Sequence, residues 1–151
     1  MLTNRRVVTG HNEEGASCVV FDSTMDALPL PYPPVALAWV TDGLVASNEG
    51  SDDTCTAVPS IELWNAHNAK FILMEMQPGD EHPTHQTDTV DFAVVLSGHV
   101  RLTLDTEEVI LGPGDLMVDR GARHAWNVHG NEPAVMVAVI VPAHPRSGKD
   151  A

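Results

Sequence analysis

Two clusters of histidine and acidic residues lie close together in the second half of this 151-residue chain. The first, at residues 79–91, includes His85 and Asp91, and the second, at residues 114–127, includes His124. Imidazole and carboxylate groups can hold a divalent metal or transfer protons. Only short strand patterns and tight turns separate the clusters, which is typical of a small barrel with a polar site inside it. The sequence therefore predicts one functional site built from both clusters.

The elements that must position these residues are β-strands. Apolar runs alternate with turn signals such as Ser97-Gly98 and Gly112-Pro113-Gly114, at the spacing expected of an antiparallel sandwich or barrel. No apolar stripe with a period of about 3.6 residues extends beyond two turns. We therefore expect an all-β fold. Its strands are expected at residues 6–9, 17–22, 35–41, 71–76, 89–96, 100–104, 107–111, 116–118 and 134–141.

The length of the chain suits one structural domain with a single core. We expect residues 1–60 to supply N-terminal strands and a connector that pack on a barrel core of residues 61–145, with a disordered tail at 146–151. The connector contains four prolines within residues 28–34, which rules out a helix or an inner strand there. The acidic loop at 47–54 has no role assigned from its sequence.

The charge and hydropathy of the chain exclude several kinds of partner. A net charge of −13 with eight Lys and Arg residues disfavours nucleic acid and anionic membranes, because both need basic patches. No apolar stretch approaches the roughly 18 residues needed to span a bilayer. Two arginines near the N-terminus are not followed by the apolar run of a secretory signal, so a cytoplasmic location is expected. Cys18 and Cys55 are given no role.

One predicted strand is apolar on both of its faces. Residues 135–140 read Val-Met-Val-Ala-Val-Ile, which predicts a strand covered on both sides, either by the N-terminal segment or by a second subunit. The hairpin expected around Gly10 to Gly15 could also exchange onto a partner. We therefore expect a homodimer.

The first cluster resembles the first conserved motif of the cupin family, G-x5-H-x-H-x(3,4)-E-x6-G. Gly79, His85, Thr87, Asp91 and Gly98 fit its spacing residue by residue. Threonine replaces the second histidine of the motif, and aspartate replaces the glutamate.

The second cluster resembles the second cupin motif, G-x5-P-x-G-x2-H-x3-N. Gly114, Gly121 and His124 match it, but the spacing between the two glycines is one residue shorter. Asp119 stands at the proline position, and Asn127 falls one residue early. The resemblance reaches the N-terminus as well, because Arg5 to Gly10 is similar to the Arg-Arg-x-Val-Thr-Gly opening of a single-domain cupin subgroup.

The resemblance implies a jelly-roll barrel, or double-stranded β-helix, with an N-terminal β-hairpin extension. It implies no single reaction, because the fold carries dioxygenases, decarboxylases, isomerases, dehydratases, sugar epimerases and non-catalytic binders.

Two imidazoles and one carboxylate at the motif positions suit one divalent transition metal such as Zn, Fe, Mn or Ni. His85, Asp91 and His124 would be its ligands, and His82 could supply the nitrogen that Thr87 does not. The alternative is a metal-free pocket in which Asp91 and Thr87 hydrogen bond to the two motif histidines. Such a pocket could still exchange protons near neutral pH.

Four further residues are candidates for substrate binding. His82 and Thr87 would assist by ligation or hydrogen bonding. Trp126 shares a face with His124 by strand alternation, so it either forms an apolar wall for a ligand or fills the core. Arg123 could clamp a substrate carboxylate or pair with one of the 21 acidic residues.

Our first hypothesis is a small enzyme of the lyase, dehydratase, isomerase or decarboxylase type that acts on a small oxygenated organic molecule. Its catalytic residues would be His85, Asp91 and His124, acting through a metal or by direct proton transfer. The alternatives are a non-catalytic protein that binds a small molecule in the same cavity, and an iron-dependent dioxygenase.

Overall fold

The computed structural model describes residues 4–25, 35–50, 52–55, 64, 66–80 and 82–145. The connector and the tail expected at 28–34 and 146–151 lie outside these residues. Within them, the chain forms ten β-strands and no helix long and apolar enough to cross a membrane, and the predicted all-β class is confirmed. The strands are β1 (Arg5–His11), β2 (Ser17–Thr24), β3 (Val35–Val40), β4 (Lys70–Met76), β5 (Thr89–Ser97), β6 (Val100–Leu104), β7 (Glu108–Leu111), β8 (Leu116–Asp119), β9 (His124–Val128) and β10 (Ala134–Pro142).

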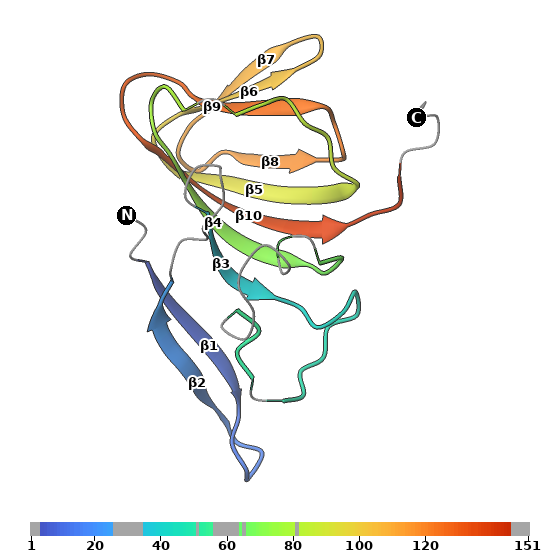
Figure 1. The fold of residues 1–151 in the computed structure, drawn as a ribbon. Coiled ribbons are helices and arrows are strands. Elements are labelled where there is room, and N and C mark those ends of the chain that lie inside the picture. Colours follow the sequence, from blue (N-terminus) through green and yellow to red (C-terminus); the bar gives the residue numbers. More distant parts are fainter. Residues whose placement is uncertain are drawn as a thin grey trace.

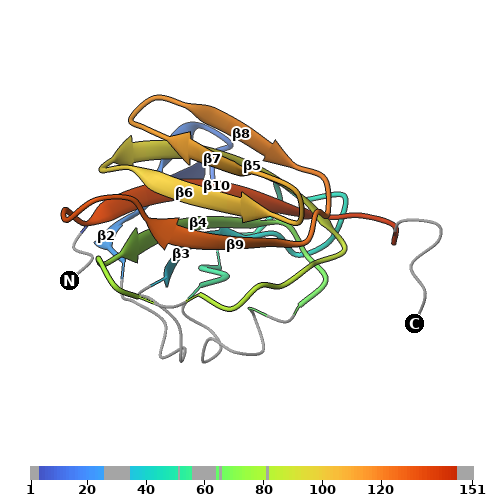
Figure 2. The same cartoon turned by 90° about the horizontal axis from the view of Figure 1, so that it is seen from above.

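Two antiparallel sheets form the body of the molecule (Figure 1). The larger has the strand order β3-β4-β10-β5-β8, and the smaller has the order β7-β6-β9. Seen from above, the strand axes of both sheets are roughly aligned, with arrows pointing both ways (Figure 2). From β5 onward the chain alternates between the two sheets, because β5, β8 and β10 belong to the larger sheet and β6, β7 and β9 to the smaller. This repeated crossing is that of a jelly roll. β1 and β2 form a separate hairpin that extends away from the two sheets (Figure 1).

The main hydrophobic core lies between the two sheets. Strand alternation sends every second apolar side chain inward, and Met76, Val95 and Val100 are almost completely buried there. Both sheets contribute, since Ile72 comes from β4 and Trp126 from β9. The core therefore lies beside the space into which His85, Asp91 and His124 project.

The two apolar faces of β10 have different partners. Met136 and Ala138 face the main core, whereas Val135 and Val137 pack against a second cluster formed by Met25, Ala36, Ala38 and Leu73. Segments of the same chain therefore account for much of the apolar outer face, the first of the two explanations expected from the sequence.

The hairpin is tied to the larger sheet by a buried ion pair. Arg6 of β1 forms a bidentate salt bridge with Asp53, and both side chains are only 8% exposed. Arg6 also donates a hydrogen bond to the carbonyl of Ala38 in β3. Asp53 belongs to the acidic loop at 47–54, so this loop has a structural contact that its sequence did not predict.

Candidate functional site

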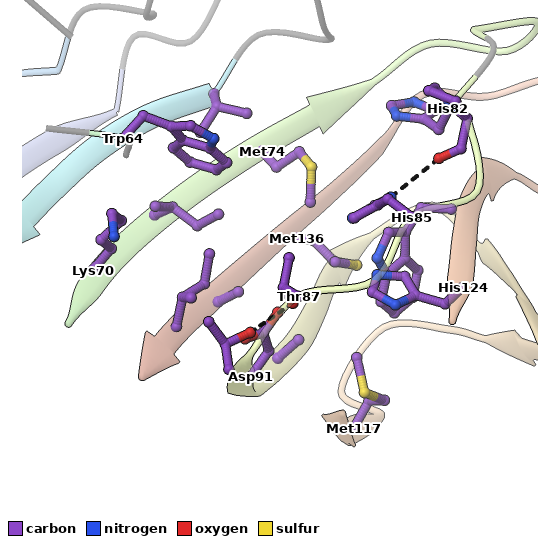
Figure 3. Close-up of a pocket in the computed structure, with 18 residues that line it drawn as sticks. Trp64, Lys70, Met74, His82, His85, Thr87, Asp91, Met117, His124 and Met136 are labelled. Carbon is purple, nitrogen blue, oxygen red and sulfur yellow. Dashed lines mark hydrogen bonds between the residues drawn. The ribbon is translucent and has the colours of Figure 1, made fainter. Parts of the chain in front are cut away.

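A cavity of about 340 Å³ opens between the two sheets (Figure 3). Its volume is at the lower end of the range of about 300–1,000 Å³ that is usual for small-molecule sites. Its wall is mostly apolar, so a ligand would bury an apolar body among a few polar groups. The apolar lining residues are Val35, Trp64, Ile72, Met74, Pro83, Ala93, Met117, Trp126, Met136, Ala138 and Ile140. The polar lining residues are Lys70, His82, His85, Thr87, Thr89, Asp91 and His124.

His85 and His124 are brought together by a backbone bridge. The amide of each residue donates a 2.9 Å hydrogen bond to the carbonyl of the other. Residues paired in this way in antiparallel strands direct their side chains to the same face. The two imidazoles accordingly lie with their ring centroids 4.5 Å apart. The convergence of the two motif histidines that the sequence predicts is therefore present.

Hydrogen bonding fixes the proton position on the His85 imidazole. Its Nδ1 lies 3.1 Å from the carbonyl oxygen of Pro83. A carbonyl can only accept, so Nδ1 must carry the proton in this contact. In the neutral ring, Nε2 is then the unprotonated nitrogen that can accept a proton or bind a ligand.

His124 has the same tautomer but a charged partner. Its Nδ1 donates to Asp119 Oδ2 at 2.8 Å and lies 2.9 Å from the carbonyl oxygen of Ala122. Only 2% of His124 and 7% of Asp119 are exposed. A buried carboxylate that accepts from Nδ1 holds the ring in one orientation and strengthens Nε2 as a base.

The turn after β8 holds this carboxylate in place. The Ala122 amide donates to Asp119 Oδ1 at 2.7 Å. Gly121 lies at φ +68°, and a Cβ there would approach the carbonyl oxygen of Thr87 to 3.0 Å. Gln86 donates to the Gly121 carbonyl at 2.6 Å. The glycine of the second motif thus allows the turn to lie against the segment that carries His85.

The Asp119–His124 pair shifts both of its pKa values. Burial alone would raise the pKa of Asp119, but hydrogen bonds from His124 and the Ala122 amide lower it below its ordinary value. Burial alone would lower the pKa of His124, but its hydrogen bonds to Asp119 and the Ala122 carbonyl, with the charges of Asp119 and Asp91, raise it. Each group stabilises the charged form of the other.

Asp91 lines the same cavity in a different environment. Burial raises its pKa, and the nearby Asp119 charge adds to this effect, although Thr89, His124 and His85 act in the opposite direction. Its Oδ1 is buried and has no hydrogen-bond partner among the described residues. Asp91 is therefore a carboxylate of the cavity wall whose hydrogen-bonding capacity is not filled within the described part of the chain.

The other predicted site residues are divided between the cavity and the surface. His82, Thr87 and Trp126 line the cavity; the Trp126 ring lies 5.5 Å from that of His124, and Thr87 hydrogen bonds to Thr89 at 2.7 Å. Burial lowers the pKa of His82, and its Nε2 has no hydrogen-bond partner within the part of the chain that the structure describes. Arg123 does not line the cavity, because its exposed guanidinium pairs with Asp105 at 2.9 Å. Of the two roles weighed for Arg123, the structure shows the ion pair.

The hydrogen bonds expected of the motif histidines in a metal-free pocket differ from those in the structure. The motif histidines were expected to bond to Asp91 and Thr87, but their partners are Pro83, Asp119 and Ala122.

The expected three-ligand metal set does not form. Among the described residues, no group of three His, Cys, Asp or Glu side chains is arranged to hold a metal ion. His85 and His124 approach each other, but Asp91 does not complete a set with them, and its Oδ1 has no partner. The residues present thus offer two imidazoles with free Nε2 atoms and not the facial set that the first motif implies.

Three site residues were missed from the sequence. Asp119 precedes His124 by five residues across a glycine turn, and its place at a motif proline concealed its role. Lys70, Ile72 and Met74 are alternate residues of β4, so strand alternation places all three on the inner face. Trp64 reaches the cavity from a segment without any strand pattern, so no sequence signal indicated it.

Comparison with known proteins supports the family suggested by the motifs. A model of the cupin domain matches residues 72–140. Phomopsin biosynthesis cluster protein C′ of Diaporthe leptostromiformis is 31% identical over 138 residues, which cover 83% of this chain and 71% of that protein. The cupin-domain-containing oxidoreductase fogC of Aspergillus ruber is 31% identical over 134 residues, which cover 83% of this chain and 65% of that protein.

A solved structure with a double-stranded beta-helix domain, from Klebsiella pneumoniae, is 23% identical and covers 52% of this chain and 71% of that one, with a TM-score of 0.47. The sequence relatives, the family model and the strand topology agree, and the chain belongs to the cupin family.

Proposed function

We propose that this cupin is an enzyme whose reaction begins with proton removal from a small, mostly apolar and oxygenated molecule bound between the sheets. The observation that carries the proposal is the 2.8 Å hydrogen bond from His124 Nδ1 to the buried Asp119 carboxylate beside the cavity. This arrangement makes His124 Nε2 a positioned general base in a cavity whose wall is mostly apolar.

His85 would be the second proton carrier. Its ring lies next to that of His124, and its Nδ1 proton is engaged with a backbone carbonyl, which leaves Nε2 available. One imidazole could accept a proton from the substrate while the other donates to a leaving or rearranging oxygen, once protonated. That pattern fits a dehydratase, isomerase or other lyase-type reaction. Trp126 and the methionines would hold the apolar body of the substrate.

The base can be tested without knowing the natural substrate. The probe is 5-nitrobenzisoxazole, which undergoes the Kemp elimination. A base removes the proton on C3, the C–H electrons form a nitrile, and the N–O bond breaks to release a coloured phenolate. We expect His124→Gln to lower kcat/KM for this probe about 100-fold, because a positioned base contributes about 10²–10⁴. Asp119→Asn should lower it about 10- to 100-fold, because the imidazole remains but loses the charged partner that orients it.

The matched control is His99→Gln, which changes an exposed histidine that does not line the cavity. It should leave the rate unchanged. If His124→Gln also leaves the rate unchanged while its circular dichroism spectrum matches that of the wild type, His124 is not the base and the proposal is wrong.

Two other classes of function compete with this one. Relatives named as oxidoreductases favour a redox reaction, in which the same base would take a proton while a separate acceptor takes the electrons. Chromatographic and mass analysis of the purified protein for a bound redox cofactor, followed by its reduction with candidate alcohols, would distinguish that class. A non-catalytic binder would bind apolar ligands in the cavity with no rate difference between wild type and His124→Gln.

A further inference from the structure

A row of paired residues crosses the inner face of the larger sheet. Lys70 in β4 pairs with Ile140 in β10, Ile140 pairs with Asp91 in β5, and Asp91 pairs with Asp119 in β8. Directly paired residues point to the same face, so Lys70 and Asp91 face the cavity from two strands apart, about 10 Å between their Cα atoms. Figure 3 shows Lys70 at the end of the cavity away from His82, His85 and His124.

The Lys70 ammonium is held at that end by backbone carbonyls. Its Nζ donates to Ala66 at 2.5 Å and to Asn68 at 3.1 Å, and the residue is only 7% exposed. An ammonium has three donors, so these two contacts leave one for a group in the cavity. No other hydrogen bond of Nζ is present among the described residues.

Asp91 provides the complementary acceptor. Its Oδ1 is buried and unpartnered, and no ion pair joins it to Lys70 within the described part of the chain. A buried carboxylate oxygen without a partner carries a desolvation cost, which a ligand donor would remove. The cavity wall therefore includes a donor in β4 and an acceptor in β5, on the same face of the larger sheet.

We propose that Lys70 and Asp91 together bind a hydroxyl group of the substrate, at a site separate from the His85–His124 pair. A hydroxyl can accept a hydrogen bond from the ammonium and donate one to the carboxylate at the same time. The preferred ligand is then a compact apolar molecule with an alcohol, enol or phenol group at one end and its reacting carbon near His124. This inference rests on the proposed function, because it takes the cavity as the substrate site.

Other polar groups satisfy the pair less well. A carboxylate would accept from Lys70 but would meet the charges of Asp91 and its neighbour Asp119. An ammonium would donate to Asp91 but repel Lys70. A ketone or ether would accept from Lys70 and leave Asp91 Oδ1 without a donor. The hydroxyl group is therefore preferred over the substrate carboxylate for which Arg123 was considered.

The test uses three probes of similar shape, with affinities measured by isothermal titration calorimetry on the full chain. Indan-1-ol can accept and donate, indan-1-one can only accept, and 1-methylindane can do neither. For the wild type we expect the alcohol to bind about tenfold more tightly than the ketone, and the ketone several-fold more tightly than the hydrocarbon, as hydrogen bonds to charged groups predict.

Each side chain should control one of the two affinity ratios. Asp91→Leu should bring the alcohol-to-ketone ratio close to one, and Asp91→Asn, which keeps the side-chain shape, should give an intermediate ratio if the leucine variant does not fold. Lys70→Met should bring the ketone-to-hydrocarbon ratio close to one, with Lys70→Arg as the variant that retains a donor. His99→Gln changes an exposed residue outside the cavity and should leave both ratios as in the wild type.

The His124→Gln variant separates this inference from the proposed function. If it loses the Kemp activity and keeps both affinity ratios, both proposals stand. If it keeps the activity and the ratios respond only to residues 70 and 91, the hydroxyl site stands and the base assignment fails. If the wild type binds all three probes equally, or if the ratios do not change in the Asp91 and Lys70 variants, the hydroxyl site is refuted whatever the activity shows.

Discussion

Asp91 and Asp119 lie directly opposite each other on β5 and β8, yet their pKa values move in opposite directions. Burial acts on both and favours the neutral acid. Asp119 has in addition the hydrogen bonds from His124 and the Ala122 amide, and these hold its pKa low. Asp91 lacks comparable donors, and its pKa stays raised. Two neighbouring carboxylates whose environments separate their pKa values are suited to different roles, one as the partner of a base and one as a ligand-binding group.

The first prediction concerns stability and pH. The pKa of folded His124 lies above its ordinary value of 6.5, so the stability it contributes is fully present below about pH 6.5 and is lost as pH rises through the folded value. The pKa of folded Asp119 lies below 3.8, so its contribution is present above about pH 4 and is lost as pH falls through the folded value. Both contributions coexist between about pH 4 and 6.5.

We therefore expect the Tm difference between wild type and Asp119→Asn to be largest near about pH 5.5 and to shrink by about pH 9. Differential scanning calorimetry across that range measures it, with His99→Gln as the control. A Tm difference that is the same at every pH would show that the ion pair does not form.

The second prediction concerns metal. The base proposed here depends on Asp119 and not on a three-ligand centre, and the described residues form no such centre. We expect dialysis against a chelator to leave the Kemp rate unchanged. Elemental analysis of the purified protein before and after dialysis is the accompanying measurement. Loss of the rate on dialysis, with recovery on adding Fe²⁺ or Zn²⁺, would instead show that His85 and His124 hold a metal completed by other ligands.

The third prediction concerns the turn that connects β5 to β6. Gly98 lies at φ +69°, and a Cβ there would approach the Pro133 carbonyl oxygen to 2.3 Å and the Ala134 Cα to 2.7 Å. Gly98→Ala should lower the free energy of unfolding by about 3 kcal/mol or more, from backbone strain plus a steric clash. Urea denaturation measures it.

Gly114→Ala is the matched control, because Gly114 also has a positive φ, of +87°, but no atom within 4 Å of the added Cβ. It should cost only about 1–2 kcal/mol. Equal costs for the two variants would mean that the Gly98 turn can move away from Pro133.

The fourth prediction is the homodimer expected from the sequence, which has not been tested. Phe71, Phe92 and Val139 lie on neighbouring strands and are 36–49% exposed, so part of the outer face stays apolar although the chain covers the rest. We expect light scattering at micromolar concentration to give the mass of a dimer, and Phe92→Lys to give a monomer, because a charge would be buried. A monomeric wild type would rule out this interface.

The sequence determined where the strands lie and which side chains of each strand share a face. Alternation is a local property, so the shared face of His124 and Trp126 followed from two positions in one strand. The motif spacing placed His85 and His124 at the ends of neighbouring β-segments, and the family followed from the same residues.

Only the tertiary structure decided which side chains from different strands meet. The pairing of β5 with β8 placed Asp119 opposite Asp91, and the insertion of β10 between β4 and β5 set Lys70 two strands from Asp91. The partner of Arg123 is likewise on another segment, at Asp105. Alternation within one strand fixes the face on which each side chain lies, but it does not say which residue of another strand lies opposite. For that reason the strands and their inward-facing residues could be predicted, whereas the partners that give each polar residue its chemistry could not.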